Sequence, residues 1–136
     1  MRNRAKQRQA GFTLLEVLVS VVVLSVALLG TAALTANSLK ANNTSYYLSQ
    51  ATVMADDILD RMRANITQAR DGQYNIALNG SKTAGANTLE NFDCTEWLAT
   101  LAQTLPQGKG SVNYDGGVVT IVINWDDQSF TTMSQL

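Results

Sequence analysis

Apolar residues along this chain of 136 residues fall into two patterns, the first of which is a continuous run. Between Glu16 and Lys40 lie 23 residues without a charge, nearly all of them apolar or small. As a helix, residues 17–36 would be about 30 Å long, which matches the hydrocarbon core of a membrane. The run therefore predicts a membrane-spanning helix. An ordinary secretory signal peptide would instead have a shorter apolar run, followed by a small-residue cleavage site.

Beyond this run the helical spacing continues, but only one face stays apolar. Apolar residues recur every three or four positions, at Tyr47, Ala51, Met54, Ile58, Met62 and Ile66. Two pairs of opposite charge have a spacing that stabilises a helix, namely Asp57 with Arg61 and Asp60 with Arg63. We therefore expect one helix from about Phe12 to about Arg70, with Asp71-Gly72 as its stop.

The middle of the chain predicts a loop and then a short helix. Residues 71–91 are rich in Gly, Asn, Ser and Thr, which indicates a connecting loop with a short strand near 74–78. Asp93 is followed three positions later by Glu96, an acidic variant of the capping box, so a helix is expected to begin there. Its apolar residues at helical spacing are Trp97, Leu98, Leu101 and Leu105, before Pro106 and Gly108.

The last part of the chain predicts strands. Residues 111–114 and 118–125 flank Asp115-Gly116-Gly117, a pattern typical of a β-hairpin. Residues 129–133 predict a third strand. The fold class is therefore α+β: a long N-terminal α-helix, half transmembrane and half amphipathic, packed on a small antiparallel β-sheet.

Composition excludes several kinds of active site. The chain has no His and one Cys, Cys94, so His-ligated metal sites, His-based catalysis and an internal disulfide are excluded. No glycine-rich phosphate-binding loop is present. Two acidic clusters are interpreted as solvated surface, because two or three carboxylates fall short of the six to eight oxygens of a calcium site. These are Asp56, Asp57 and Asp60, and Asp126 with Asp127. We expect no enzyme, no metal and no cofactor.

Three residues whose side chains are suited to binding are instead expected to be part of the core. Trp97 and Trp125 would form a binding surface if exposed, but core packing is the expected role of such large rings. Cys94 is expected to be a small buried residue, the alternative being a link between molecules.

Charge is concentrated before the apolar run. Four of the first eight residues are cationic, Arg2, Arg4, Lys6 and Arg8, and such residues stay on the cytoplasmic side of a membrane. Glu16 lies near the start of the run, where a carboxylate costs roughly 2.5–3.5 kcal/mol on insertion scales. The residues alone leave two interpretations open: Glu16 snorkels to the interface, or it awaits a cationic partner.

The segment Gly11-Phe12-Thr13-Leu14-Leu15-Glu16-Val17-Leu18-Val19, between a short basic leader and about 20 apolar residues, resembles the class III signal of type IV prepilins and pseudopilins. The resemblance implies that prepilin peptidase cuts between Gly11 and Phe12. It implies methylation of the new amino terminus at Phe12. It further implies that Glu16 attracts the terminal charge of a neighbouring subunit. Cutting would leave 6 cations against 11 carboxylates.

A second resemblance covers most of the chain. The segment Asp60-Arg61-Met62-Arg63-Ala64-Asn65, followed by Gly72-Gln73-Tyr74, is similar to minor pilins of the PilV type, the type IV pilus modification proteins. So is the later arrangement of Cys94, Trp97, Leu105-Pro106, Gly108, Gly110 and Trp125-Asp126. A second Cys often found in such proteins is missing, so Cys94 has no partner here for the intradomain disulfide that they usually contain.

The resemblances imply a structural role. We expect a minor pilin of a type IV pilus priming or tip complex that supports twitching motility and adhesion. Expected partners are the major pilin and other minor pilins, prepilin peptidase, the inner-membrane assembly machinery and membrane lipid, with no nucleic acid. The alternatives are a minor pseudopilin of a type II secretion system and a DNA-uptake competence pilin, although the acidic balance disfavours DNA binding.

The same resemblances imply the domain order and location. Residues 1–11 are expected to be the leader, 12–36 the transmembrane or filament-core helix and 37–136 a periplasmic domain. The chain would be anchored once in the bacterial inner membrane before it enters the pilus at the cell surface.

Overall fold

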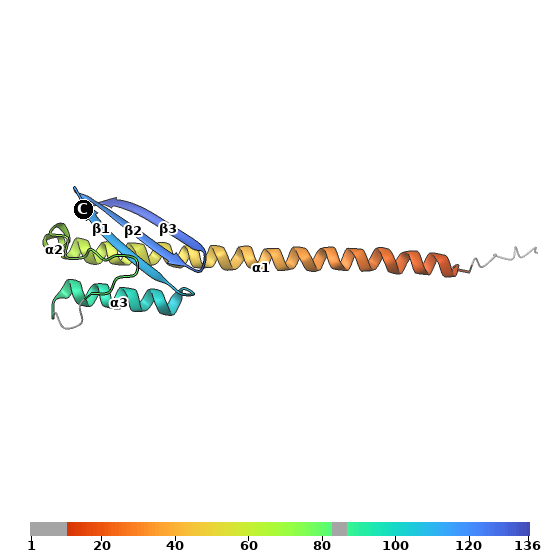
Figure 1. Cartoon of the computed structure of the whole chain (residues 1–136). Coiled ribbons are helices and arrows are strands. Elements are labelled where there is room, and N and C mark those ends of the chain that lie inside the picture. Colours follow the sequence, from red (N-terminus) through yellow and green to blue (C-terminus); the bar gives the residue numbers. More distant parts are fainter. Residues whose placement is uncertain (1–10, 83–86) are drawn as a thin grey trace, which may run out of the picture. The chain divides into compact units, whose positions relative to one another are not determined.

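The computed structural model describes residues 11–82 and 87–136. The chain divides into two compact units, Met1–Asn42 and Asn43–Leu136, and each is described by itself. Figure 1 shows the order of the helices and strands along the chain. They are α1 (Leu14–Ala64), α2 (Ile66–Arg70), α3 (Leu89–Thr104), β1 (Lys109–Asp115), β2 (Val118–Trp125) and β3 (Gln128–Gln135).

The described residues of the first unit, 11–42, belong mostly to the apolar part of α1. All its described side chains are exposed, and the helix is long and apolar enough to cross a membrane by length and composition. Hydroxyl groups in this part bond back to the helix itself: Ser20 Oγ donates to the Glu16 carbonyl and Ser25 Oγ to the Val21 carbonyl, each at 2.7 Å. These donors therefore need no water, as an apolar medium requires.

In the second unit, α1 buries the predicted apolar stripe. Its buried residues are Ala51, Met54, Ala55, Ile58, Leu59 and Met62. The prediction of an unbroken helix to about Arg70 is wrong at one residue. Asn65 leaves the helical region (φ −119°, ψ 51°), so that α2 forms a separate short turn. The amide of Asn65 donates to the hydroxyl of Tyr74 at 3.4 Å, a tertiary contact that sequence periodicity does not reveal.

The predicted stop after α2 is confirmed. Gly72 has φ +73°, and its N–H donates to the Ala69 carbonyl, while that of Gln73 donates to the Gln68 carbonyl. This pair of bonds is a Schellman motif, which places a residue in the left-handed region and therefore favours glycine.

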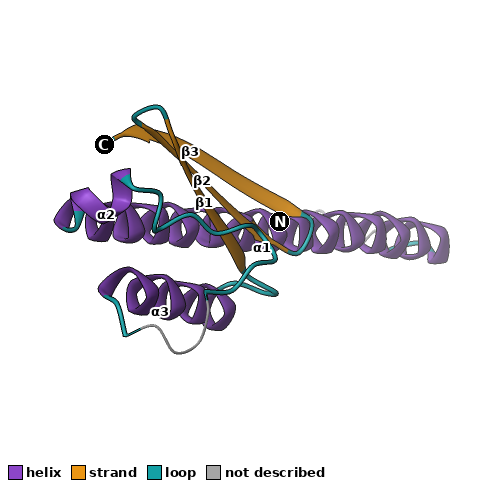
Figure 2. Ribbon diagram, turned by 60° about the vertical axis from the view of Figure 1, so that its left-hand side comes forward, coloured by secondary structure: helices purple, strands orange, loops and turns teal. Residues whose placement is uncertain are grey.

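The predicted hairpin and third strand are confirmed. The sheet is antiparallel with the order β1-β2-β3. Figure 2 shows its three strands together with α1 and α3. Gly116 and Gly117 join β1 to β2 with φ values of 57° and 92°, so both central residues of the turn are left-handed, as in a type I′ hairpin. One face of the sheet is apolar, and its buried residues Val112, Val119, Ile121, Ile123 and Trp125 form the core with α1 and α3.

The predicted start of the short helix is wrong. α3 begins at Leu89 after Thr88, which places Asp93 inside the helix rather than at its cap. Asp93 is buried, and its carboxylate bonds to Arg61 and Tyr74, so a tertiary role replaces the predicted capping role. The strand predicted near 74–78 is reduced to one bridge, between Ile76 and Val112.

Trp97 joins the three layers of the core, as predicted for a packed tryptophan. Its indole Nε1 donates to the Met54 carbonyl of α1 at 2.9 Å. Its ring lies against Gly110 of β1, where an added Cβ would be 2.3 Å from the indole Cη2. The absent side chain at Gly110 therefore allows α3 to approach β1.

We predict that Gly110→Ala destabilises the second unit by about 1–3 kcal/mol, because the new methyl group overlaps the Trp97 ring in a packed core. Ser111→Ala on the same strand is the control, with a loss below about 0.5 kcal/mol. Urea unfolding followed by tryptophan fluorescence measures both free energies. Equal stability of the two variants would contradict the close packing.

Candidate functional site

The residues expected to be processed lie directly before α1. Gly11 and Phe12 precede the helix, and Phe12 is 83% exposed. Thr13 is the capping residue, since its side-chain oxygen accepts the N–H of Glu16 at 3.3 Å. The Gly11–Phe12 bond is therefore in exposed, non-helical chain, and the helix that follows has a defined start.

Thr13 is a site residue that our sequence interpretation missed. Thr13 and Glu16 have the Thr-x-x-Glu spacing of a capping box, which was visible in the sequence. The same N–H of Glu16 also donates to the Thr13 carbonyl at 3.1 Å, so Thr13 offers this first-turn donor two acceptors.

Glu16 is the acidic residue of the first turn of α1, and the next carboxylate in the sequence is Asp56. The N-terminal end of a helix carries a partial positive charge, which favours a carboxylate there. Cleavage before Phe12 would add an ammonium group to this same end. Glu16 would then be the carboxylate nearest in sequence to that ammonium group.

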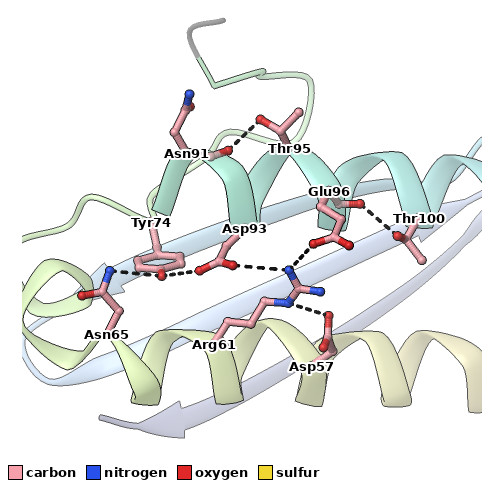
Figure 3. A network of polar contacts seen from close by, with 9 residues as sticks. All are labelled: Asp57, Arg61, Asn65, Tyr74, Asn91, Asp93, Thr95, Glu96 and Thr100. Atoms are coloured by element: carbon pink, nitrogen blue, oxygen red, sulfur yellow. Dashed lines mark hydrogen bonds and ion pairs between the residues drawn. The ribbon is translucent and has the colours of Figure 1, made fainter. Parts of the chain in front are cut away.

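A separate polar network joins α1 to α3 in the second unit (Figure 3). Arg61 is its centre. Its guanidinium contacts Asp57 at 3.1 Å on its own helix, and Asp93 at 3.3 Å and Glu96 at 2.7 Å on α3. One cation thus bridges three carboxylates from two helices, which fixes the register of α3 against α1.

The network extends from Asp93 to the segment between α2 and α3. The Tyr74 hydroxyl donates to the second carboxylate oxygen of Asp93 at 2.7 Å. Burial raises the pKa of Tyr74 above its ordinary value, and the hydrogen bond to Asp93 raises it further. The hydrogen bond to Glu96 raises the pKa of Arg61, while burial opposes it. Both groups therefore keep their protons, and the network holds helices together rather than exchanging protons.

Cys94 is buried and free, as predicted for a small core residue. Its Sγ lies 3.9 Å from the Tyr74 carbonyl. Burial raises the pKa of the Cys94 thiol to about 11. In the folded chain it is therefore an inaccessible thiol rather than a link between molecules.

Asp126 and Asp127 lie exposed at the turn between β2 and β3. Asp126 has φ 43°, which suits the tight turn. Among the described residues, 11–82 and 87–136, no three His, Cys, Asp or Glu side chains gather in a metal-binding group.

Comparison with known protein families identifies the prokaryotic N-terminal methylation motif over residues 6–32. This match covers the end of the basic leader, the Gly11–Phe12 junction, Glu16 and much of the apolar run. No curated protein and no solved structure matches the chain significantly. The motif supports a subunit of the pilin or pseudopilin kind. Proteins of this kind are structural subunits, processed by prepilin peptidase and assembled into pilus-like complexes.

The fold agrees with the motif. The long apolar helix followed by a small antiparallel sheet is an α+β, pilin-like arrangement. The class III signal and the apolar helix together indicate membrane anchoring. The Arg61 network lies outside the matched residues and is a feature of this chain's second unit.

We predict that the second unit loses stability between pH 9 and pH 11, and that part of this loss comes from Cys94. The thiol pKa is raised in the folded state, from 9.0 to about 11, so its contribution is complete below pH 9 and disappears as pH rises through the folded value. Urea unfolding across this range should show a flatter decline for Cys94→Ala than for the unaltered chain. Parallel curves would contradict the buried-thiol origin.

Proposed function

We propose that this chain is a minor pilin of a type IV pilus, of the PilV type, acting in a priming or tip complex and thereby supporting twitching motility and adhesion. The observation that carries the proposal is the N-terminal methylation motif, with its Gly11–Phe12 junction and Glu16 in the first turn of α1. The proposed partners are the major pilin, other minor pilins and the inner-membrane assembly machinery.

Charge supports the proposed orientation in the membrane. The leader holds four cations within its first eight residues, which favours a cytoplasmic amino terminus. The second unit, residues 43–136, has five cations against ten carboxylates. It is therefore proposed to be periplasmic before the chain enters the filament.

The paired arginines argue against DNA uptake. Arg61 is bonded to three carboxylates, and Arg63 contacts Asp60 at 3.0 Å. A nucleic-acid surface needs cations available for phosphates. The segment around these arginines resembles minor pilins of the PilV type, which favours a pilus over a type II secretion system.

We predict that Gly11→Val blocks processing, because the peptidase must accommodate the residue before the cut. Mass spectrometry of the chain from its bacterial host should show the leader retained. Gly30→Ala, a glycine with equally open surroundings inside α1, is the matched control and should be processed normally. A mature Phe12 terminus in the Gly11 variant would overturn the assignment.

We predict that Glu16 serves assembly rather than processing. Glu16→Val should be cut normally but co-purify about tenfold less with other pilins from detergent-solubilised inner membrane, because an unpaired terminal ammonium remains in the bundle. Glu16→Asp should be intermediate, since the charge remains on a shorter side chain. Ser20→Ala, one turn further along α1, is the control. Undiminished co-purification of Glu16→Val would leave Glu16 as an interfacial snorkelling residue.

A further inference from the structure

The two edges of the sheet differ in how they are closed. The edge of β1 is covered by the chain itself: Ile76 exchanges both backbone hydrogen bonds with Val112, at 2.8 and 3.0 Å. Beside it, the Asn75 side chain accepts the N–H of Tyr114 at 2.7 Å. β3 is the opposite edge, on the side of the sheet away from α3 in Figures 1 and 2. Within 11–82 and 87–136, no strand or bridge pairs with its outer side.

The register shows which backbone groups of β3 face outward. The N–H of Leu136 donates to the Gly117 carbonyl, toward β2. Hydrogen-bonding direction alternates along a strand, so the even-numbered residues pair with β2 and the odd-numbered ones face the open edge. The outward-facing residues, all with exposed side chains, are Ser129, Thr131, Met133 and Gln135.

The open edge lacks the usual protection against pairing. Natural edge strands are commonly shortened or interrupted by Lys, Pro or a bulge. β3 has eight residues, none of them charged and none a proline, and it pairs with β2 without a bulge. Its sequence therefore leaves a regular row of donors and acceptors available for another strand.

Charges mark the two ends of this edge. Asp126 and Asp127 are exposed at the turn where β3 begins. At the other end, Arg70 donates to the Leu136 carbonyl at 3.1 Å. An incoming strand fits best when it is uncharged in the middle, basic beside the turn and acidic beside Arg70.

We propose that β3 accepts an extended strand from a different pilin-type subunit, by backbone pairing at Ser129, Thr131, Met133 and Gln135. This inference rests on the proposed function and adds an interface to it. The affinity would come from main-chain hydrogen bonds, and the orientation from the charges at the two ends.

The chain direction disfavours a second copy of this chain as the occupant. Two antiparallel β3 strands would be related by a half-turn about the normal to the sheet, which would also match Asp126 to Arg70. However, the same half-turn reverses the part of α1 that packs on the sheet. The Asn43 ends of the two second units would then lie at opposite ends of the pair, which disfavours insertion of both preceding apolar runs into one membrane.

The test compares two substitutions at one edge position in the full chain, expressed in its bacterial host. Thr131→Pro removes the outward N–H and should lower the amount in sheared filaments by about tenfold relative to the membrane pool. Thr131→Ala keeps this N–H and is the matched control, with filament content unchanged. Because the Thr131 N–H faces away from β2, both variants should retain cooperative unfolding. If Thr131→Pro does not fold, Met133→Pro tests the same edge.

Two charge-reversal variants test the orientation of the incoming strand. Asp127→Lys, at the start of β3, should lower filament content about threefold, whereas Asp115→Lys, at the other turn of the sheet, should not. Hydrogen exchange gives a direct reading: the Thr131 and Met133 amides should be protected in filaments and exchange fast when this chain is produced without other pilins. Protection in the chain alone would indicate a second copy and overturn the proposed occupant.

The remaining outcomes separate the two proposals. If the unaltered chain is cut and found in filaments but both proline variants enter equally well, strand pairing is overturned and the minor-pilin assignment stands. If the unaltered chain is cut but absent from filaments, both proposals are overturned.

Discussion

α1 must bury apolar side chains in two different surroundings, and this requirement governs the rest of the molecule. Its first part is apolar on every face and exposes all of its described side chains within this chain. Its second part has one buried stripe, from Ala51 to Met62, against the sheet and α3. A uniformly apolar helix needs lipid or other helices around it, whereas a one-sided helix needs a folded domain. Anchoring and folding are thus assigned to successive parts of one element.

The docking of α3 depends on two contacts of different character. Trp97 fills the space above Gly110 and bonds to a backbone carbonyl of α1, which favours close approach of the layers. The ion pairs of Arg61 with Asp57 and Glu96 lie at the margin of the core, where each carboxylate side chain is 49% exposed. Such partly exposed pairs add little net free energy and serve mainly to select one arrangement. Packing therefore supplies most of the stability, and the charges select the register.

The sequence predicts local structure well where a residue type or spacing is compatible with only one backbone geometry. Gly116-Gly117 specifies the hairpin turn, Gly72 ends the helical region, and the apolar spacing of α1 identifies its buried face. The errors arise where a tertiary contact overrides a local signal. Asp93 has the spacing of a cap but is used by Arg61 and Tyr74, and Asn65 interrupts the helix where its side chain meets Tyr74. The Gly11–Glu16 motif could be recognised in the sequence because its residues are consecutive. The open edge of β3 could not be predicted, because it depends on the order of the strands in the sheet.

The buried thiol ties the order of folding to the chemistry of the compartment. Cys94 is protected only after α3 has docked, since the other core layers cover its sulfur. Before docking, the thiol is accessible and has an ordinary acidity, so an oxidant meets a far more reactive group. In an oxidising compartment, the docking of α3 therefore competes with oxidation of this thiol. If the thiolate attacked a small-molecule disulfide, one thiol would be released and the other would stay on Cys94 as a mixed disulfide, a group larger than the fully buried side chain beside Tyr74. Rapid docking of α3 therefore also keeps Cys94 reduced.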